Sequence, residues 1–120
     1  MKYLQIKKEN SIATVSINRP NAMNALSIEV LKEFCTLQEY FRKDLDTRVV
    51  IFTGEGDHFS AGADLKEKPQ LSTKLESWRN NFGKPAIKSI LDIDQITIAA
   101  VNGYCLGGAA CIVSACDFRI

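Results

Sequence analysis

The stretch Asn102–Gly108 reads NGYCLGG and directly follows Ile96–Val101, a hydrophobic run that is typical of a buried strand. The same arrangement occurs earlier in the chain, where the apolar run Val49–Phe52 precedes the small-residue stretch Phe59–Leu65, which reads FSAGADL. Glycine and alanine in such turns let the backbone approach a ligand closely, because no large side chain intervenes. Two such turns side by side would direct two backbone N–H groups at one carbonyl oxygen, which is the geometry of an oxyanion hole. The pair therefore predicts acyl chemistry.

Size and composition indicate one small globular domain. The chain has 120 residues, 46% of them hydrophobic, and a formal net charge of +1, which gives no reason to expect nucleic acid or an acidic membrane surface as a partner. No apolar run approaches the length of a membrane span, and Met1–Lys8 lacks the hydrophobic stretch of a secretory signal. The four cysteines form no C-x-x-C pair and there is a single histidine, so we expect no metal site. Free thiols favour a reducing compartment, either the cytoplasm or an organelle matrix.

Strand, turn and helix patterns follow one another along the chain, which predicts an α/β fold. The expected elements are a hairpin of Tyr3–Lys7 and Ile12–Asn18 around the turn Glu9–Ser11, a helix from Ile28 to about Lys43 capped by Ser27, strands Val49–Thr53 and Ile96–Val101, a polar loop Lys66–Thr73, helices Leu75–Phe82 and Ala86–Leu91, and a fully buried helix Gly107–Cys116.

Three of these expectations carry a specific physical reason. We expect Gly83–Pro85 to interrupt the helical stretch, because proline disfavours helical geometry in the residue before it. The apolar, β-branched run Val49–Thr53 is typical of a parallel sheet covered on both faces. The chain stops at Cys116–Ile120, where an apolar strand is beginning, so we expect a fragment of a longer protein.

Other functions that use glycine-rich turns, such as nucleotide binding and serine hydrolysis, fit the sequence less well. Gly54-Glu55-Gly56 begins like a dinucleotide-binding loop, but Phe59 occupies the place of the third glycine. No phosphate-binding G-x-x-x-x-G-K-[ST] motif occurs, and Ser60 does not lie in the G-x-S-x-G motif of serine hydrolases. A purely structural interpretation stays open, in which the glycines only permit close packing of strand and helix.

Three segments taken together resemble the crotonase superfamily, the enoyl-CoA hydratase/isomerase family. They are Asn18–Leu26 (NRPNAMNAL), Val49–Leu65, and Ala99–Gly108 followed by Ser114–Asp117. The resemblance covers essentially the whole chain but only about the N-terminal half of the family's usual domain. It implies that residues 1–120 are the N-terminal portion of one acyl-CoA-binding domain, a spiral of β-β-α units. It also implies a role in fatty acid metabolism and assembly into homotrimers or hexamers when full length.

By this resemblance, the backbone N–H groups of Ala63 and Gly108 bind the thioester oxygen of the substrate. The residues themselves agree, because a helix opening at Gly107-Gly108 would direct free amides and the positive end of its dipole at developing charge. The resemblance further implies that the coenzyme A arm lies along Ala22, Asn24, Ala61, Asp64 and Leu65, mostly through backbone atoms, and that Lys66 reaches a phosphate unless it is simply a solvated lysine. No permanent cofactor is expected: coenzyme A arrives as part of an acyl-CoA or acyl-carrier thioester.

Cys111 is the main departure from the family pattern. Hydratases of the family carry a glutamate at this position, three residues after the second oxyanion glycine. Hydration needs two carboxylates, and a thiol, with an ordinary pKa of about 8.5, is a poor replacement. We therefore expect an isomerase-like or decarboxylase-like reaction through an enolate, with Cys111 buried as a small apolar side chain. No base for a nucleophilic thiol is visible, because we expect His58 to lie at the surface on a different turn.

Two alternatives remain. The chain would be a non-catalytic acyl-CoA-binding homologue if it kept the pocket and lost the chemistry, or a truncated inactive product that aggregates through exposed sheet edges. The family's second catalytic carboxylate would lie beyond Ile120. Asp64 and Asp117 are more readily explained as braces of a turn and of a strand start.

Overall fold

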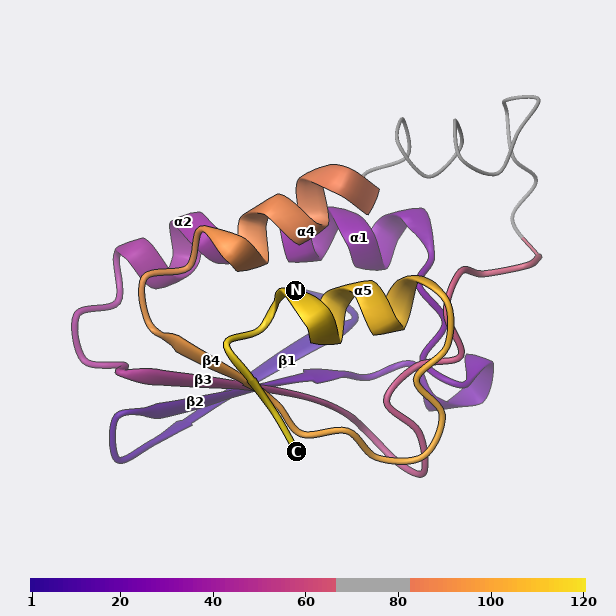
Figure 1. Cartoon of the computed structure of the whole chain (residues 1–120), viewed down its shortest axis with the longest axis horizontal. Coiled ribbons are helices and arrows are strands. Elements are labelled where there is room, and N and C mark those ends of the chain that lie inside the picture. The colour runs from indigo at the N-terminus through magenta and orange to yellow at the C-terminus, as the bar shows by residue number, and fades with distance from the viewer. Residues whose placement is uncertain (67–82) are drawn as a thin grey trace.

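The fold is a five-stranded sheet with helices along one of its faces (Figure 1). The computed structural model describes residues 1–66 and 83–120. The strands lie in chain order: β1 (Leu4–Glu9) pairs antiparallel with β2 (Ile12–Ile17), and β3 (Val49–Gly54), β4 (Ile96–Ala99) and β5 (Phe118–Arg119) then add in parallel. The predicted α/β fold class is confirmed, and so is the strand expected to begin at the end of the chain.

The hairpin of β1 and β2 turns through Asn10 and Ser11, both with left-handed φ angles of 52° and 66°. This is the backbone of a tight two-residue hairpin turn, and asparagine tolerates it well. The turn places Ala13 and Val15 of β2 in the core, toward the helices. The predicted hairpin is therefore correct, although β1 runs two residues further than expected, to Glu9.

The helix predicted from Ile28 to about Lys43 is two helices, so that prediction is wrong. Helix α1 (Ile28–Cys35) begins as expected, with the Ser27 hydroxyl accepting the Val30 N–H at 3.2 Å. It ends because the Thr36 N–H and hydroxyl both donate to the Glu33 carbonyl, at 3.1 and 2.7 Å. Such local bonds tighten the last turn and compete with continued α-helix. Helix α2 (Leu37–Arg42) then starts anew.

Helix α4 (Gly83–Leu91) contains the three residues that were expected to interrupt it. Pro85 is tolerated because it lies in the first turn, where backbone N–H groups have no helical partner to lose. The predicted helix Leu75–Phe82 and the predicted loop after Lys66 lie outside the described residues. Helix α5 (Gly108–Ala115) buries Ala109, Ile112 and Val113 against the core.

The sheet is covered on one face only, as far as the described residues show. Val50 and Phe52 of β3 are buried beneath the helices, whereas Ile51 and Ile98 on the other face are half-buried and Ile96 is 49% exposed. The expectation that this strand is covered on both faces is therefore wrong for this part of the chain. Alternation of buried and half-exposed residues along β3 follows directly, because successive side chains of a strand point to opposite faces.

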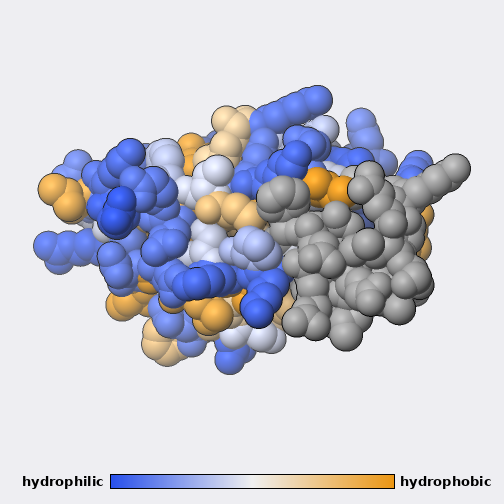
Figure 2. Space-filling model, turned by 90° about the horizontal axis from the view of Figure 1, so that it is seen from above, coloured by the Kyte–Doolittle hydropathy of each residue, from blue (hydrophilic) through white to orange (hydrophobic). Residues whose placement is uncertain are grey.

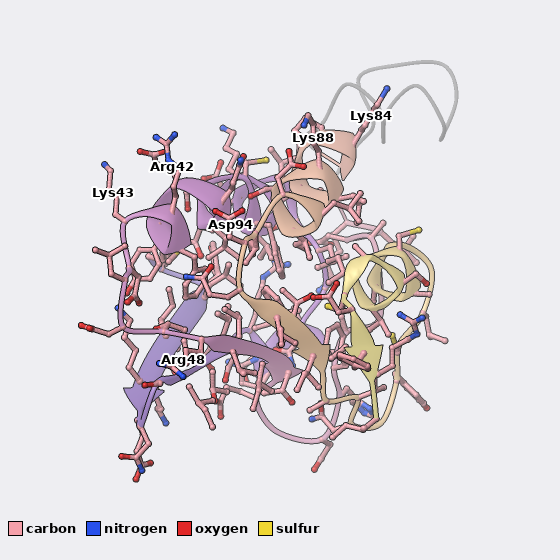
Figure 3. All side chains as sticks on the ribbon, turned by 60° about the vertical axis from the view of Figure 1, so that its left-hand side comes forward. Arg42, Lys43, Arg48, Lys84, Lys88 and Asp94 are labelled. Carbon is pink, nitrogen blue, oxygen red and sulfur yellow. The ribbon has the colours of Figure 1, made fainter. Side chains whose placement is uncertain are left out.

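The outer side of the helical layer is mostly hydrophilic (Figure 2). Arg42 and Lys43 extend outward from α2, and Lys84 and Lys88 from α4 (Figure 3). Arg42 and Lys43 both pair with Glu39, at 2.6 and 3.3 Å. These exposed pairs contribute little stability, and they mark the solvent side of amphipathic helices.

Four phenylalanines form the centre of the core, and one of them anchors the functional region. Phe34 of α1 stacks on Phe52 of β3, with ring centroids 6.1 Å apart, and Phe41 is buried beside them. Phe59 is also fully buried and begins the stretch Phe59–Leu65. Burial of each ring stabilises the fold by about 1.5–3 kcal/mol, so this stretch starts from a firmly held point.

Candidate active site

We refer to Asn18–Leu26 as the first turn, Phe59–Leu65 as the second turn and Asn102–Gly108 as the third turn. All three meet beyond the carboxyl ends of the parallel strands (Figure 1). This is the edge at which ligands commonly bind in sheets of this kind.

The second and third turns lie side by side, as the sequence predicted. The Ser60 N–H donates to the Tyr104 carbonyl at 2.9 Å, and the Leu106 N–H donates to the Ser60 carbonyl at 3.2 Å. Gly62 has a φ of +93°, and a Cβ placed on it would lie 2.6 Å from the Leu106 oxygen and 3.7 Å from the Gly107 Cα. Both the backbone conformation and the contact therefore require glycine at this position.

On its other side, the second turn is bonded to the first. The Leu26 N–H donates to the Gly62 carbonyl at 2.7 Å, and the Asp64 N–H donates to the Leu26 carbonyl at 3.4 Å. Because the groups on either side of Ala63 face Leu26, the N–H of Ala63 itself points away from the first turn. Ala63 is exposed, and no described residue accepts its amide hydrogen.

The third turn ends in the amino terminus of α5, as predicted. Gly107 is the N-cap with a φ of +54°, and Gly108 is the first helical residue. The N–H groups of Ala109 and Ala110 bond back to Leu106 and Gly107, both at 3.0 Å. Within the described part of the chain, the Gly108 N–H has no acceptor, and it lies at the positive end of the helix dipole.

Asn24 is a structural clamp between the first turn and the loop that follows β3. Its side chain is 1% exposed, accepts the Arg19 N–H at 2.8 Å, and donates to the Glu55 and His58 carbonyls at 2.9 and 2.7 Å. The carboxamide is thus fully used within the protein. Only backbone atoms of Asn24 remain to contact a ligand.

Asp64 braces its turn, as expected. It pairs with Arg19 at 2.9 Å and accepts the Lys66 N–H at 3.0 Å. Burial opposes ionisation of this carboxyl, but the Lys66 amide and the Arg19 guanidinium outweigh it and hold the pKa of Asp64 below its usual range. Of the other residues assigned to coenzyme A, Ala22 and Ala61 are half-buried, and Leu65 and Lys66 are exposed.

His58 and Asn102 join the third turn to the loop that precedes the second turn, and sequence reasoning missed both roles. His58 was expected at the surface on a separate turn, but it is half-buried, and its Nδ1 accepts the Tyr104 N–H at 3.0 Å. The Asn102 carboxamide donates to the Gly54 and Gly56 carbonyls at 2.9 and 3.1 Å. Asn102 stands directly before Gly103, which is typical of turn-stabilising contacts, whereas no local signal marks His58.

Comparison with known proteins shows to which family the chain belongs. The family model for enoyl-CoA hydratase/isomerase matches residues 7–120. The chain belongs to this family. It is 37% identical to a short-chain-enoyl-CoA hydratase of Clostridium acetobutylicum over 96% of its own length and 44% of the relative's. It is 33% identical to a peroxisomal Δ(3,5)-Δ(2,4)-dienoyl-CoA isomerase of Arabidopsis thaliana, covering 98% of this chain and 48% of that protein.

Solved structures of the hydratase/isomerase family share the fold. An enoyl-CoA hydratase/carnithine racemase from Magnetospirillum magneticum superposes with a TM-score of 0.89 at 31% identity, over 99% of this chain and 46% of that one. An enoyl-CoA hydratase from Bacillus anthracis gives 0.87 at 32% identity, over 98% and 46%. The crotonase resemblance is thereby confirmed. The chain spans about half the length of the relatives it matches.

Cys111 departs from its expected environment as well as from the hydratase pattern. We expected it buried within a helix that is apolar all round, but it is exposed on α5. The buried face of the helix carries Ala109 and Ile112 instead, so only one side of the helix meets the core. The exposed thiol lies one helical turn after Gly108.

The described residues add two further observations. They contain no group of three histidine, cysteine or acidic side chains placed to hold a metal ion. None of their helices is long and apolar enough to cross a membrane.

Proposed function

We propose that this chain supplies the oxyanion hole of an acyl-CoA enzyme, with the backbone N–H groups of Ala63 and Gly108 binding the thioester oxygen. The observation that carries the proposal is a pair of amides, on two turns bonded to each other, whose hydrogens no residue among 1–66 and 83–120 accepts. Such amides are poised to donate to a ligand.

The two donors stabilise the charge that develops when the thioester becomes an enolate. They are held by the fold before the reaction starts, so no reorganisation is needed as the oxygen gains charge. The dipole of α5 adds a favourable potential at Gly108. Loss of one such donor typically costs about 2.7–4 kcal/mol of transition-state stabilisation.

We infer an isomerase-like or decarboxylase-like reaction rather than hydration. In the first, a proton leaves one carbon of the acyl chain and returns to another, which moves the double bond. In the second, a malonyl-type thioester loses carbon dioxide and leaves the enolate. Neither needs the carboxylate that hydration uses at the position of Cys111, and the proposal gives this thiol no acid–base role.

The proposed substrate is a coenzyme A thioester, with coenzyme A bound only as part of it. Backbone atoms of Ala22, Asn24, Ala61, Asp64 and Leu65 would line its path. Lys66 is exposed and carries a mobile cation that suits a phosphate group. The proposed setting is fatty acid metabolism in the cytoplasm or an organelle matrix, in a homotrimer or hexamer that light scattering can detect.

Calorimetric titration with crotonyl-CoA is the first test. We expect micromolar or tighter binding, and no binding at millimolar ligand would overturn the proposal. Turnover of enoyl, dienoyl and malonyl thioesters then identifies the reaction.

Gly108→Pro sharpens that test, because it deletes one amide donor while keeping the helix start. Gly108 is the first helical residue, the position at which proline is best accommodated. We expect turnover to fall by about 10²–10³ without loss of folding. Gly108→Ala keeps the N–H and is the matched control, which should retain most activity.

The exposed Cys111 favours a second candidate function, that of a non-catalytic acyl-CoA-binding homologue. Thioester affinity without turnover of any of the three substrate classes would support it. A third possibility, a truncated inactive product, predicts aggregation and dye binding, whereas a monodisperse sample with a cooperative melt would exclude it.

A further inference from the structure

We propose that His58 is a positioning residue whose neutral imidazole holds the third turn, and with it Gly108, in the arrangement that binds a thioester. Protonation of the ring removes this support and weakens thioester binding in mild acid. The part of the inference that concerns binding rests on the proposed function. The part that concerns the ring and the third turn does not.

The contact between His58 and Tyr104 is specific in both geometry and packing. Besides the 3.0 Å bond from the Tyr104 N–H to Nδ1, the two rings stack with centroids 4.2 Å apart and planes 14° from parallel. A Cβ on Gly103 would lie 2.4 Å from Nδ1, and Gly103 has a φ of +58°. A Cβ at this position would also collide with the Asp57 carbonyl oxygen, so glycine lets the third turn pack closely against both Asp57 and the imidazole.

This bond determines the protonation state of the ring. A backbone N–H can only donate, so Nδ1 must be without hydrogen and the single proton must sit on Nε2. A protonated imidazole carries hydrogen on both nitrogens and has no acceptor left. It would then present an N–H group to the Tyr104 N–H, and the bond would be lost.

The backbone at His58 is itself held firmly by hydrogen bonds and by the buried residue that follows it. Its carbonyl accepts the Asn24 carboxamide at 2.7 Å, and the next residue, Phe59, is fully buried with its N–H bonded to the Asn102 carbonyl. Tyr104 is held at both of its backbone groups, by His58 at the N–H and by Ser60 at the carbonyl. Loss of the imidazole bond thus releases one of two restraints four residues before Gly108.

Few other charged groups surround the ring in the described part of the structure. The loop of His58 carries Glu55 and Asp57, and the third turn carries the Tyr104 phenol and the Cys105 thiol, whose pKa is raised by burial. The first turn touches this loop through an uncharged asparagine, and its arginine is paired elsewhere. A change in binding between neutral pH and mild acid therefore tests the imidazole, the single histidine side chain of the sequence.

Two variants distinguish the hydrogen-bond acceptor of His58 from its stacked aromatic ring. His58→Asn places an amide oxygen near the position of Nδ1, so it keeps an acceptor that does not titrate. His58→Phe keeps an aromatic ring on Tyr104 but offers no acceptor. In wild type, we expect affinity for crotonyl-CoA to be several-fold lower in mild acid than at neutral pH, because a protonated ring has no acceptor for the Tyr104 N–H.

The variants should differ from wild type in opposite ways. At about pH 7.5, we expect His58→Phe to bind crotonyl-CoA about 10-fold more weakly, and His58→Asn to bind within about 2-fold of wild type. Neither variant should lose affinity in mild acid as wild type does. Wild-type affinity in the phenylalanine variant, or an undiminished acid effect in the asparagine variant, would overturn the inference.

Nitrogen-15 NMR tests the contact without any thioester. His58 is the single histidine of the chain, so its ring signals need no assignment by mutation. We expect the Nε2–H tautomer at neutral pH and faster hydrogen exchange of the Tyr104 amide in His58→Phe than in His58→Asn. An Nδ1–H tautomer, or equal exchange in the two variants, would refute the positioning role. If wild type shows this tautomer and exchange but no thioester binding, the positioning role stands and the proposed function falls.

Discussion

The second and third turns present one candidate donor each, but the fold holds them very differently. The second turn begins at the buried Phe59, is bonded to a neighbouring turn on both sides, and is tied to the first turn by the ion pair of Arg19 and Asp64. The third turn is exposed at Tyr104 and Leu106, and after its clamped first residue, Asn102, it is restrained by bonds to Ser60 and His58. Substitutions in the second turn should therefore cost stability, whereas those at 104–108 in the third should mainly change binding.

Gly62→Ala should cost more stability than the changes at Gly56, Asn24, Asn102 and Asp64 that follow. The new Cβ meets the Leu106 carbonyl oxygen at 2.6 Å, and the backbone stays in a left-handed conformation. We expect the free energy of unfolding to fall by about 3 kcal/mol, measured by urea denaturation. Gly56→Ala is the control, because Gly56 is also left-handed (φ +78°) but its Cβ would meet only Pro20, at 3.7 Å. It should cost about 1 kcal/mol, and equal losses would show that contact between the turns is unimportant.

Comparing Asn24→Gly with Asn102→Gly tests the same difference between a buried contact and a more exposed one. Both side chains clamp the loop after β3, but Asn24 is 1% exposed and Asn102 is half-exposed to water. Glycine suits the left-handed backbone of Asn24, so the change tests the hydrogen bonds alone. We expect losses of about 2–3 kcal/mol for Asn24→Gly and about 1 kcal/mol for Asn102→Gly in thermal and urea unfolding. A larger loss of stability for Asn102→Gly than for Asn24→Gly would contradict the clamping role of Asn24.

Asp64→Asn should have a smaller effect, and one that depends on pH. The side chains of Arg19 and Asp64 are 26% and 9% exposed, so at neutral pH we expect a loss of about 1 kcal/mol. The folded-state pKa of Asp64 is lowered, so its contribution is complete above about pH 4 and is lost as the pH falls through the folded-state pKa. Urea melts at about pH 7 and about pH 3 should show the difference from wild type shrinking in acid.

An exposed ion pair serves as the control for that prediction. Glu29 pairs with Lys32 at 3.5 Å, and the Glu29 side chain is 66% exposed. Glu29→Gln should change stability by less than Asp64→Asn at neutral pH, because water screens the pair. A larger loss for the exposed residue would contradict the bracing role of Asp64.

Local sequence patterns predicted a strand or helix correctly where one hydrophobic repeat or one capping residue was enough to place it. The alternation along Ile12–Ile17 and the cap at Ser27 were enough to place the hairpin and the start of α1. They did not predict the end of α1, because the Thr36 hydroxyl bond to Glu33 leaves the apolar spacing unchanged. The effect of Pro85 was misjudged for a related reason: it depends on where the helix begins, which the sequence does not mark.

The candidate site was predictable in its backbone and less so in its side chains. The two small-residue turns were predicted because each follows a strand, which is a local pattern, whereas the choice of Ala63 and Gly108 within them came from the family resemblance. The bond between His58 and Tyr104 joins residues 46 positions apart, which no local pattern reports. Cys111 was placed wrongly because α5 has few polar residues, so its sequence does not show which side meets the core.

The central claim is that the amides of Ala63 and Gly108 bind one oxygen together. The most direct measurement is a proton–nitrogen NMR titration of the protein with acetyl-CoA, compared with the thioether analogue in which the carbonyl is replaced by a methylene. We expect both amides to shift downfield together with acetyl-CoA and neither to do so with the thioether. Binding of acetyl-CoA that leaves either amide unshifted, or equal shifts with both ligands, would contradict it.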